Sequence, residues 1–225
     1  MNFLSHYYFE RYAPESEQVL GGLLPDLLKN ADKDYSFQIN KFADRLVFHP
    51  KSSLITDGWL RHVEVDKVFH SSEFFYTHTH ALRKQIEDVV ADLPIRASFL
   101  AHIALELILD HRLIVHNVLS VERLYEHLEH VDRKVLSAYL SAFNEVDLDK
   151  FYRFYDRFLE TRYIFDYLDI NNIPHALYNI CKRVWNFDVQ PHHLEVLAQR
   201  LDDYNSTQLT NYKEVYIFVN DNIAM

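Results

Sequence analysis

The feature that most constrains the fold is an apolar stretch at residues 95–118, RASFLAHIALELILDHRLIVHNVL. Its apolar side chains cover nearly the whole circumference of a helix, and neighbouring elements must bury such a helix. The stretch also carries Glu106 and Asp110. A buried carboxylate is strongly destabilising unless a cation or a metal ion compensates it. We therefore expect a central helix with positive charge or metal close to these two acids.

The rest of the chain repeats the helical period, with apolar residues three and four positions apart. Pro50 breaks this pattern, and Ser52 or Ser53 is the expected N-cap of the helix that follows. Only YIFV near 216–219 suggests a strand, and its context is helical. The expected helices cover 17–30, 35–48, 53–70, 73–92, 95–116, 121–130, 132–144, 147–168, 174–186 and 191–221.

These elements predict one all-α domain over residues 1–225, folded as a multi-helix bundle. The site-bearing helices are expected within about 1–118, and 121–221 is expected to be a helical C-terminal part. With 48% apolar and 15% aromatic residues, the chain is not an intrinsically disordered one. Three glycines are too few for the turns of a β-sandwich or for a phosphate-binding glycine loop.

Charge and cysteine content exclude further classes of protein. There are 23 Lys and Arg residues against 33 Asp and Glu residues, a net charge of −10, so no nucleic-acid partner is expected. Cys181 is the single cysteine, which excludes disulfides within the chain and cysteine-based zinc sites. No membrane span and no secretory signal are recognisable, so a cytoplasmic location is expected. The oligomeric state is left open.

Histidines and carboxylates form two regular triplets with the spacing i, i+4, i+8. They are His62, Asp66 and His70, and His102, Glu106 and Asp110. On a helix each step of four residues turns the side chain by about 40° and rises about 6 Å, so each triplet forms a stripe on one face. If helices 53–70, 73–92 and 95–116 run up, down and up, the two stripes face each other.

Matched heights then pair His62 with His102, Asp66 with Glu106, and His70 with Asp110. Helix bundles build di-metal carboxylate sites from inward His and Glu side chains on facing helices. The outer pairs lie about 12 Å apart along the axis, so two divalent ions would share the middle carboxylates. A buried hydrogen-bond network is the structural alternative.

Three more residues suit a hydrolytic site. His6 lies in an apolar segment, and Asp26 follows the apolar GGLLP stretch. Either residue can supply an extra metal ligand or the general base. Arg61, or else Lys67, can neutralise a substrate phosphate. Six other histidines are expected on solvated faces: His78, His80, His127, His130, His192 and His193.

The opening MNFLSH, the GGLLPD segment that ends at Asp26, and the spacing Gly58…His62…Asp66 resemble the acyl carrier protein phosphodiesterase family. The resemblance covers roughly residues 1–115. It implies an all-α, metal-dependent phosphohydrolase that uses manganese and releases phosphopantetheine from acyl carrier protein. The positions that match are His6, Asp26, His62 and Asp66.

Other positions depart from that family. Val63 and Glu64 stand where it has two basic residues, His70 stands where it has an aspartate, and it tends to have aspartates at the positions of His102 and Glu106. The order of His62 and Asp66, then His70, then His102 and Glu106 is also similar to the zinc-dependent phospholipase C and single-strand nuclease superfamily. That group ranks second, because its secretory signal and N-terminal tryptophan are missing.

The expected function is therefore that of a metal-dependent phosphoric diester hydrolase. Mn²⁺ is the expected cofactor, with Zn²⁺ or Fe²⁺ as alternatives and two ions as the expected number. The expected substrate is a phosphoester, with acyl carrier protein as the partner that the resemblance implies. A helical protein that holds metal without catalysis, or a helical interaction domain with a purely structural stripe, is the alternative from another class.

Overall fold

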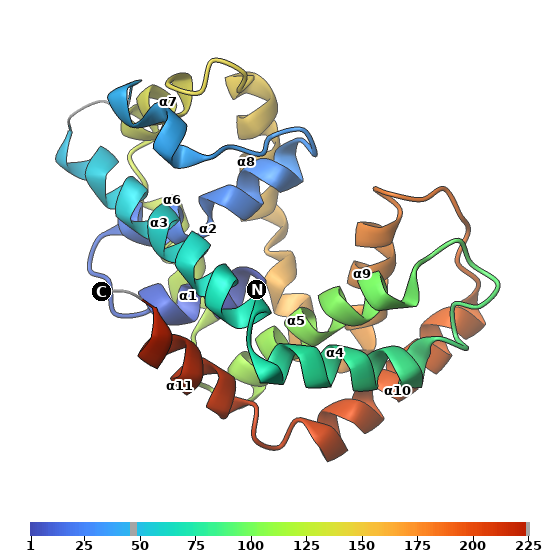
Figure 1. Ribbon diagram of the computed structural model, residues 1–225. Coiled ribbons are helices and arrows are strands. Elements are labelled where there is room, and N and C mark those ends of the chain that lie inside the picture. Colours follow the sequence, from blue (N-terminus) through green and yellow to red (C-terminus); the bar gives the residue numbers. More distant parts are fainter. Residues whose placement is uncertain (46–48, 224–225) are drawn as a thin grey trace. The chain divides into compact units, whose positions relative to one another are not determined.

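The computed structural model describes residues 1–45 and 49–223, and the regular elements in them are all helical (Figure 1). The first part of the chain forms α1 (Phe3–Glu10), α2 (Ser16–Ala31), the 3-10 helix η1 (Ile39–Arg45), α3 (Pro50–His70), α4 (Glu73–Ile86) and α5 (Ala97–Val115). The second part forms α6 (Val121–Glu129), α7 (Arg133–Ser141), α8 (Leu148–Thr161), the 3-10 helices η2 (Tyr163–Leu168) and η3 (Ile170–Asn172), α9 (Ile173–Cys181), α10 (Pro191–Gln208) and α11 (Lys213–Asn222). The all-α prediction is confirmed.

Several helix ends lie where side chains satisfy the free backbone N–H groups. Ser72 accepts from the N–H of Phe75 at the start of α4, and Ser120 caps α6 in the same way. Asp132 and Asp147 cap α7 and α8. Such caps are worth about 1 kcal/mol each, which explains why the sequence locates these helix starts well.

Other boundaries differ from the sequence prediction. Pro50 is the first residue of α3, where its missing N–H has no helical partner to lose, so Ser52 and Ser53 are not the cap. The helix expected at 35–48 is reduced to the 3-10 helix Ile39–Arg45, and its last residues, 46–48, lie outside the described residues. The helix expected at 191–221 is divided into α10 and α11.

Backbone contacts group the chain into two compact units. Unit 1 comprises residues 1–66 and 119–163 with the C-terminal end of the chain from Ile223, and unit 2 comprises 67–118 and 164–222. In unit 1, α2 packs against α1, α6 and α8. Its core is rich in large side chains, among them Tyr125, Phe151 and Phe158. The expectation of a single domain stays a prediction.

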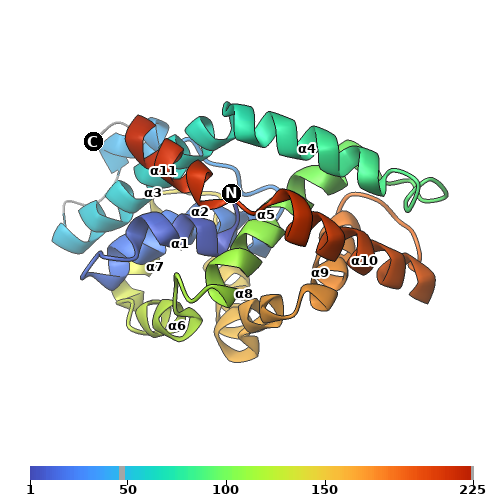
Figure 2. The ribbon, with the colours of Figure 1, turned by 90° about the horizontal axis from the view of Figure 1, so that it is seen from below.

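In unit 2, α5 is the central helix and packs along α4 and α9, while α10 packs against α9 and α4 (Figure 2). Eleven residues of α5 are buried, which confirms the burial that the sequence predicted for this segment. Asp110 is among them and is fully buried.

The close crossing of α2 and α3 in unit 1 uses two of the chain's three glycines, Gly21 and Gly58. A Cβ added to Gly21 would fall on the carbonyl group of Ile55. One added to Gly58 would overlap the Gln18 carbonyl and lie 2.6 Å from the backbone nitrogen of Gly22. Since backbone atoms cannot rotate away, only glycine permits this approach.

No helix among the described residues combines the length and the apolar character that crossing a bilayer requires.

Candidate metal centres

A first group of potential ligands lies directly beyond the glycine crossing in unit 1. Asp26 follows Gly22 by one helical turn, and His62 follows Gly58 by one turn. Ligand atoms of His6, Asp26 and His62 all lie within 4.8 Å of one another. Asp66, one turn further along α3, lies 3.3 Å from His6 Nε2 and 3.6 Å from His62 Nε2. We call these four residues the buried cluster.

The tautomer of His62 is fixed by its contact with α2. Its Nδ1 donates to the carbonyl oxygen of Gly22 over 2.9 Å. In a neutral imidazole the lone pair is then on Nε2, the atom that faces Asp66. Metal-ligating histidines are commonly held in this way, with one ring nitrogen donating to a backbone carbonyl. The close helix crossing therefore determines which ring nitrogen of His62 faces the other residues of the buried cluster.

The side chain of His6 is buried. Its ring stacks on that of His62 with the centroids 3.7 Å apart, and 2% of the residue is exposed. Among the described residues neither ring nitrogen has a hydrogen-bond partner, although Nε2 lies at ion-pair distance from Asp66. Burial, and then the neighbouring His62, lower the pKa of His6 to about 4, so the imidazole is neutral at pH 7. A neutral ring with an unpaired nitrogen is the form that binds a metal ion.

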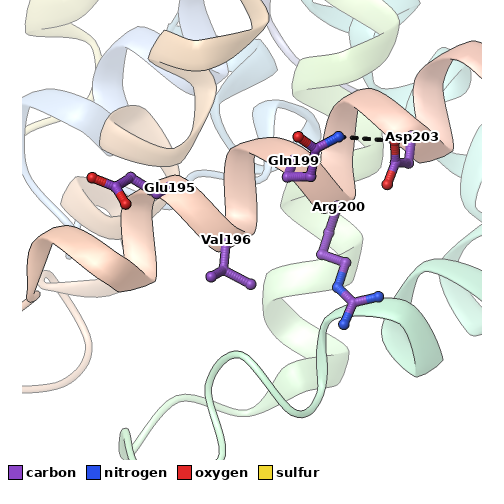
Figure 3. A pocket seen from close by; sticks show the side chains of 5 residues that line it. All are labelled: Glu195, Val196, Gln199, Arg200 and Asp203. Atoms are coloured by element: carbon purple, nitrogen blue, oxygen red, sulfur yellow. Dashed lines mark hydrogen bonds between the residues drawn. The ribbon is translucent and has the colours of Figure 1, made fainter.

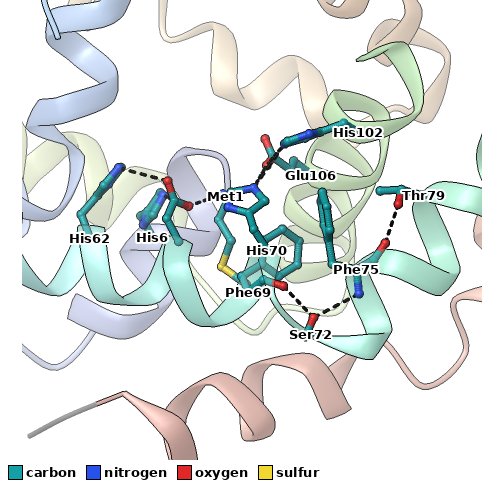
Figure 4. Close-up of polar contacts among 11 residues, drawn as sticks. Met1, His6, His62, Phe69, His70, Ser72, Phe75, Thr79, His102 and Glu106 are labelled. Carbon is teal, nitrogen blue, oxygen red and sulfur yellow. Dashed lines mark hydrogen bonds and ion pairs between the residues drawn. The ribbon is translucent and has the colours of Figure 1, made fainter. Parts of the chain in front are cut away.

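Asp66 is ionised in this setting. Burial alone would raise its pKa, but contact with His6 and the positive charge of the Met1 amino group keep the pKa well below the ordinary value. The Met1 nitrogen lies 2.6 Å from Asp66 Oδ1 (Figure 4). The buried cluster thus offers two imidazoles and two carboxyl groups, a donor set that suits first-row divalent metals.

A second group of potential ligands lies in unit 2, and we call it the triad. His70 Nε2 lies 3.2 Å from His102 Nε2 and 3.1 Å from Glu106 Oε1 (Figure 4). His102 Nε2 lies 3.0 Å from the same Glu106 oxygen. The side chains of His70, His102 and Glu106 are 32%, 41% and 13% exposed, so solvent reaches the group from one side.

Phe75 of α4 supports the triad. Its ring meets the His70 ring edge-on at 4.8 Å and the His102 ring edge-on at 4.9 Å. The Ser72 cap begins α4 at the right place for this contact. Burial opposes ionisation of Glu106, yet its pKa lies well below the usual range, with the contacts to His102 and His70 among the causes. Phe75 is a residue that sequence reasoning did not select, since a lone aromatic residue resembles an ordinary core residue.

The structure places the remaining predicted site residues differently from the sequence prediction. His70 was expected beside Asp110, but the structure places it against Glu106 and His102, one and two turns earlier on α5. Asp110 is buried and is not among the groups of converging donors found in the described part of the chain. Arg61, expected to neutralise phosphate, lies with its Nε 3.1 Å from Glu10 Oε1.

A third group, Asp92, His192 and His193, is better explained as a helix cap. His193 Nδ1 accepts from the backbone N–H of Gln190 at the start of α10, and its Nε2 lies 3.1 Å from Asp92 Oδ1. Both ring nitrogens are therefore engaged. His193 is 3% exposed, so the prediction that it lies on a solvated face was wrong. His80, His130 and His192 are exposed as predicted, whereas His78 and His127 are half-buried.

A surface hollow along α10 contains none of the predicted site residues (Figure 3). Five side chains of this one helix line it: Glu195, Val196, Gln199, Arg200 and Asp203. Gln199 donates to Asp203 over 3.0 Å, and Arg200 pairs with Asp88. The polar groups are largely paired with one another, so we do not place a functional site there.

Comparison with known proteins adds no assignment: no family model, curated protein or solved structure matches this chain. The functional proposal therefore rests on the geometry of the two groups of potential ligands.

Proposed function

We propose that the protein is a divalent-metal-dependent phosphoric diester hydrolase and that the buried cluster is its catalytic metal centre. The observation that carries the proposal is His6, a fully buried imidazole whose Nδ1 has no hydrogen-bond partner in the described residues and whose Nε2 faces the Asp66 carboxylate at 3.3 Å. An unsatisfied buried polar group costs about 1–3 kcal/mol, and a metal ion would remove that cost. Resemblance to the carrier protein phosphodiesterases at His6, Asp26, His62 and Asp66 adds independent support.

In this proposal His6, His62, Asp26 and Asp66 hold the ion. A bound metal would polarise a phosphoryl oxygen and lower the pKa of a water molecule. Gly22 keeps His62 in the tautomer that presents Nε2. Asp26 is half-buried, so its carboxylate can reach solvent and accept a proton from water, whereas buried His6 is suited to metal binding rather than proton transfer.

The substrate class is a phosphodiester, and acyl carrier protein is the macromolecular substrate that the resemblance suggests. Arg61 is 42% exposed and is paired with Glu10, so its charge is partly committed before any phosphate arrives. Mn²⁺ is the proposed cofactor, with Zn²⁺ and Fe²⁺ as alternatives.

The test is hydrolysis of bis-p-nitrophenyl phosphate by the full chain, purified without metal and assayed with and without Mn²⁺. Turnover is expected only with the metal, and Asp26→Asn is expected to lower it by about 100-fold or more. Asp34→Asn, at an exposed position close in sequence, is the matched control and should keep the parental rate. Equal rates with and without metal, or a fully active Asp26→Asn, would contradict the proposal. Phosphopantetheine-loaded acyl carrier protein, assayed in parallel, tests the partner.

A metal-binding protein without catalytic activity is the second candidate, and one observation favours it. His6 and His62 are 2% and 6% exposed, and structural metal sites are closed in this way. The side chain of Asp66, 33% exposed, leaves one side open. Stoichiometric metal without turnover of either substrate would select this second candidate.

A further inference from the structure

The triad in unit 2 carries an inference that does not depend on the proposed hydrolase. Three potential ligand atoms, His70 Nε2, His102 Nε2 and Glu106 Oε1, form a triangle with sides of 3.0, 3.1 and 3.2 Å. All three come from residues 70–106, so one unit supplies the whole group. The question is what stabilises three such atoms at these distances.

Protons alone do not satisfy this triangle. If both imidazoles carry a proton on Nε2, each donates to Glu106 Oε1, and two N–H groups then face each other across the 3.2 Å side. If one Nε2 is unprotonated, its lone pair faces the carboxylate oxygen at close range. With Glu106 as the carboxylate, every protonation state of the two rings leaves at least one side of the triangle joining two groups of the same polarity.

A single cation resolves this conflict, because all three atoms can direct lone pairs at it. For a triangle of this size, an ion about 1 Å above the plane lies about 2.0–2.1 Å from each atom, the usual length of zinc–imidazole and zinc–carboxylate bonds. Two imidazoles with one carboxylate favour zinc and similar transition metals, whereas magnesium and calcium prefer oxygen ligands.

We propose that His70, His102 and Glu106 form a second, independent transition-metal site of the zinc class, with coordination positions open to solvent. The exposed sides of His70 and His102 leave room for water or an exogenous ligand. Phe75 closes the opposite side by packing its edge against both rings. Binding here requires no ligand from the buried cluster.

The experiment is a Zn²⁺ titration of the metal-free full chain against a competing chromophoric chelator. The triad is expected to bind one equivalent tightly in the parent, and the buried cluster adds a second equivalent where the proposed function holds. Glu106→Gln, which preserves the shape of the side chain, is expected to weaken one equivalent by more than about 100-fold. His80→Ala removes an exposed histidine from α4 and should leave Zn²⁺ binding unchanged. Circular dichroism checks that each variant keeps its helix content.

A second variant and a spectroscopic measurement keep the test decisive. If Glu106→Gln does not fold, His102→Ala, at a partly exposed position, takes its place as the test variant. It should weaken one equivalent of Zn²⁺ to the same extent. Asp26→Asn, which alters only the buried cluster, should retain the visible Co²⁺ spectrum of the triad. The proposal fails if Glu106→Gln or His102→Ala titrates like His80→Ala, or if Asp26→Asn abolishes that spectrum. If Asp26→Asn is the only variant that loses metal, that metal came from the buried cluster, and the result tests the proposed hydrolase and not the triad.

Discussion

At the scale of single residues, two buried glutamates of unit 1 show how neighbours set the charge of a carboxyl group. Glu10 and Glu17 are both 2% exposed. Glu17 Oε1 accepts from Lys51 Nζ over 2.7 Å and from the Asp132 amide over 3.2 Å. Glu10 Oε2 accepts from the neutral Gln18 amide, and its Oε1, which has no hydrogen bond in the described contacts, lies 3.1 Å from Arg61 Nε.

The pKa values of these two residues shift in opposite directions. Burial raises the pKa of Glu10 more than Gln18 and Arg61 lower it. Burial also opposes ionisation of Glu17, but Lys51 and the Asp132 amide lower its pKa below 4.5. By linkage, the contribution of Glu10 to stability is lost as pH rises through its raised pKa, whereas that of Glu17 is lost as pH falls through its lowered pKa.

We therefore predict opposite pH slopes for two matched substitutions. Relative to the parent, Glu10→Gln should become more stable as the pH rises from 4 to 7, since it removes a buried charge. Glu17→Gln should become less stable over the same range, because Lys51 loses its partner. Urea unfolding at several pH values measures both free energies. Parallel curves for the two variants would show that burial, not the neighbours, decides the charge.

At the scale of elements, the α2–α3 crossing determines where His62 lies. In Gly58→Ala the new methyl group would overlap the Gln18 carbonyl and the Gly22 nitrogen, so the helices must separate. We expect a loss of about 1–3 kcal/mol, larger than the gain in helix propensity of up to about 1 kcal/mol. Metal affinity of the buried cluster should fall as well, because separation breaks the bond from His62 to Gly22.

Chemical denaturation and metal titration of Gly58→Ala test this prediction. Ser53→Ala, at an exposed position of the same helix, is the control and should change neither quantity appreciably. A Gly58→Ala variant as stable as the parent would mean that the glycines are not needed for the close approach.

The start of α10 provides a second prediction for a single element. His193 links the Gln190 amide to Asp92 and closes the first turn of the helix. His193→Ala should lower the free energy of unfolding by about 1 kcal/mol, the usual effect of losing an N-terminal cap. Its metal content should equal that of the parent, because we assign no metal to this group. A drop in bound metal would contradict the assignment of His193 as a cap.

Comparison of sequence and structure shows which features are local. Helix geometry alone places residues four positions apart on the same face of a helix. The sequence therefore predicts the potential ligands of α3 and α5 without knowledge of the fold. The register between helices is not local. The expected helix at 73–92 ends at Ile86, and residues 87–96 connect α4 to α5 without helix. This connection sets the height of α5, which is why His70 meets His102 and Glu106.

At the scale of the whole molecule, metal binding and folding are linked. An ion that binds only the folded chain stabilises it by about 2.7 kcal/mol at a free concentration 100 times its Kd. For a chain of this size that corresponds to a rise in Tm of roughly 5–10 °C. The net charge of −10 is a second reason to expect that bound metal stabilises the folded chain, because bound cations reduce the repulsion among acidic groups.

Thermal unfolding with excess Mn²⁺ and with chelator tests the central claim, that the buried cluster is a metal centre, most directly. The account predicts that Mn²⁺ raises the Tm of the parent and of Asp34→Asn by several degrees over the value in chelator. In Asp26→Asn most of this rise should be absent. The account would be contradicted if the Tm of the parent were the same in Mn²⁺ and in chelator, or if Asp26→Asn gained as much from Mn²⁺ as the parent.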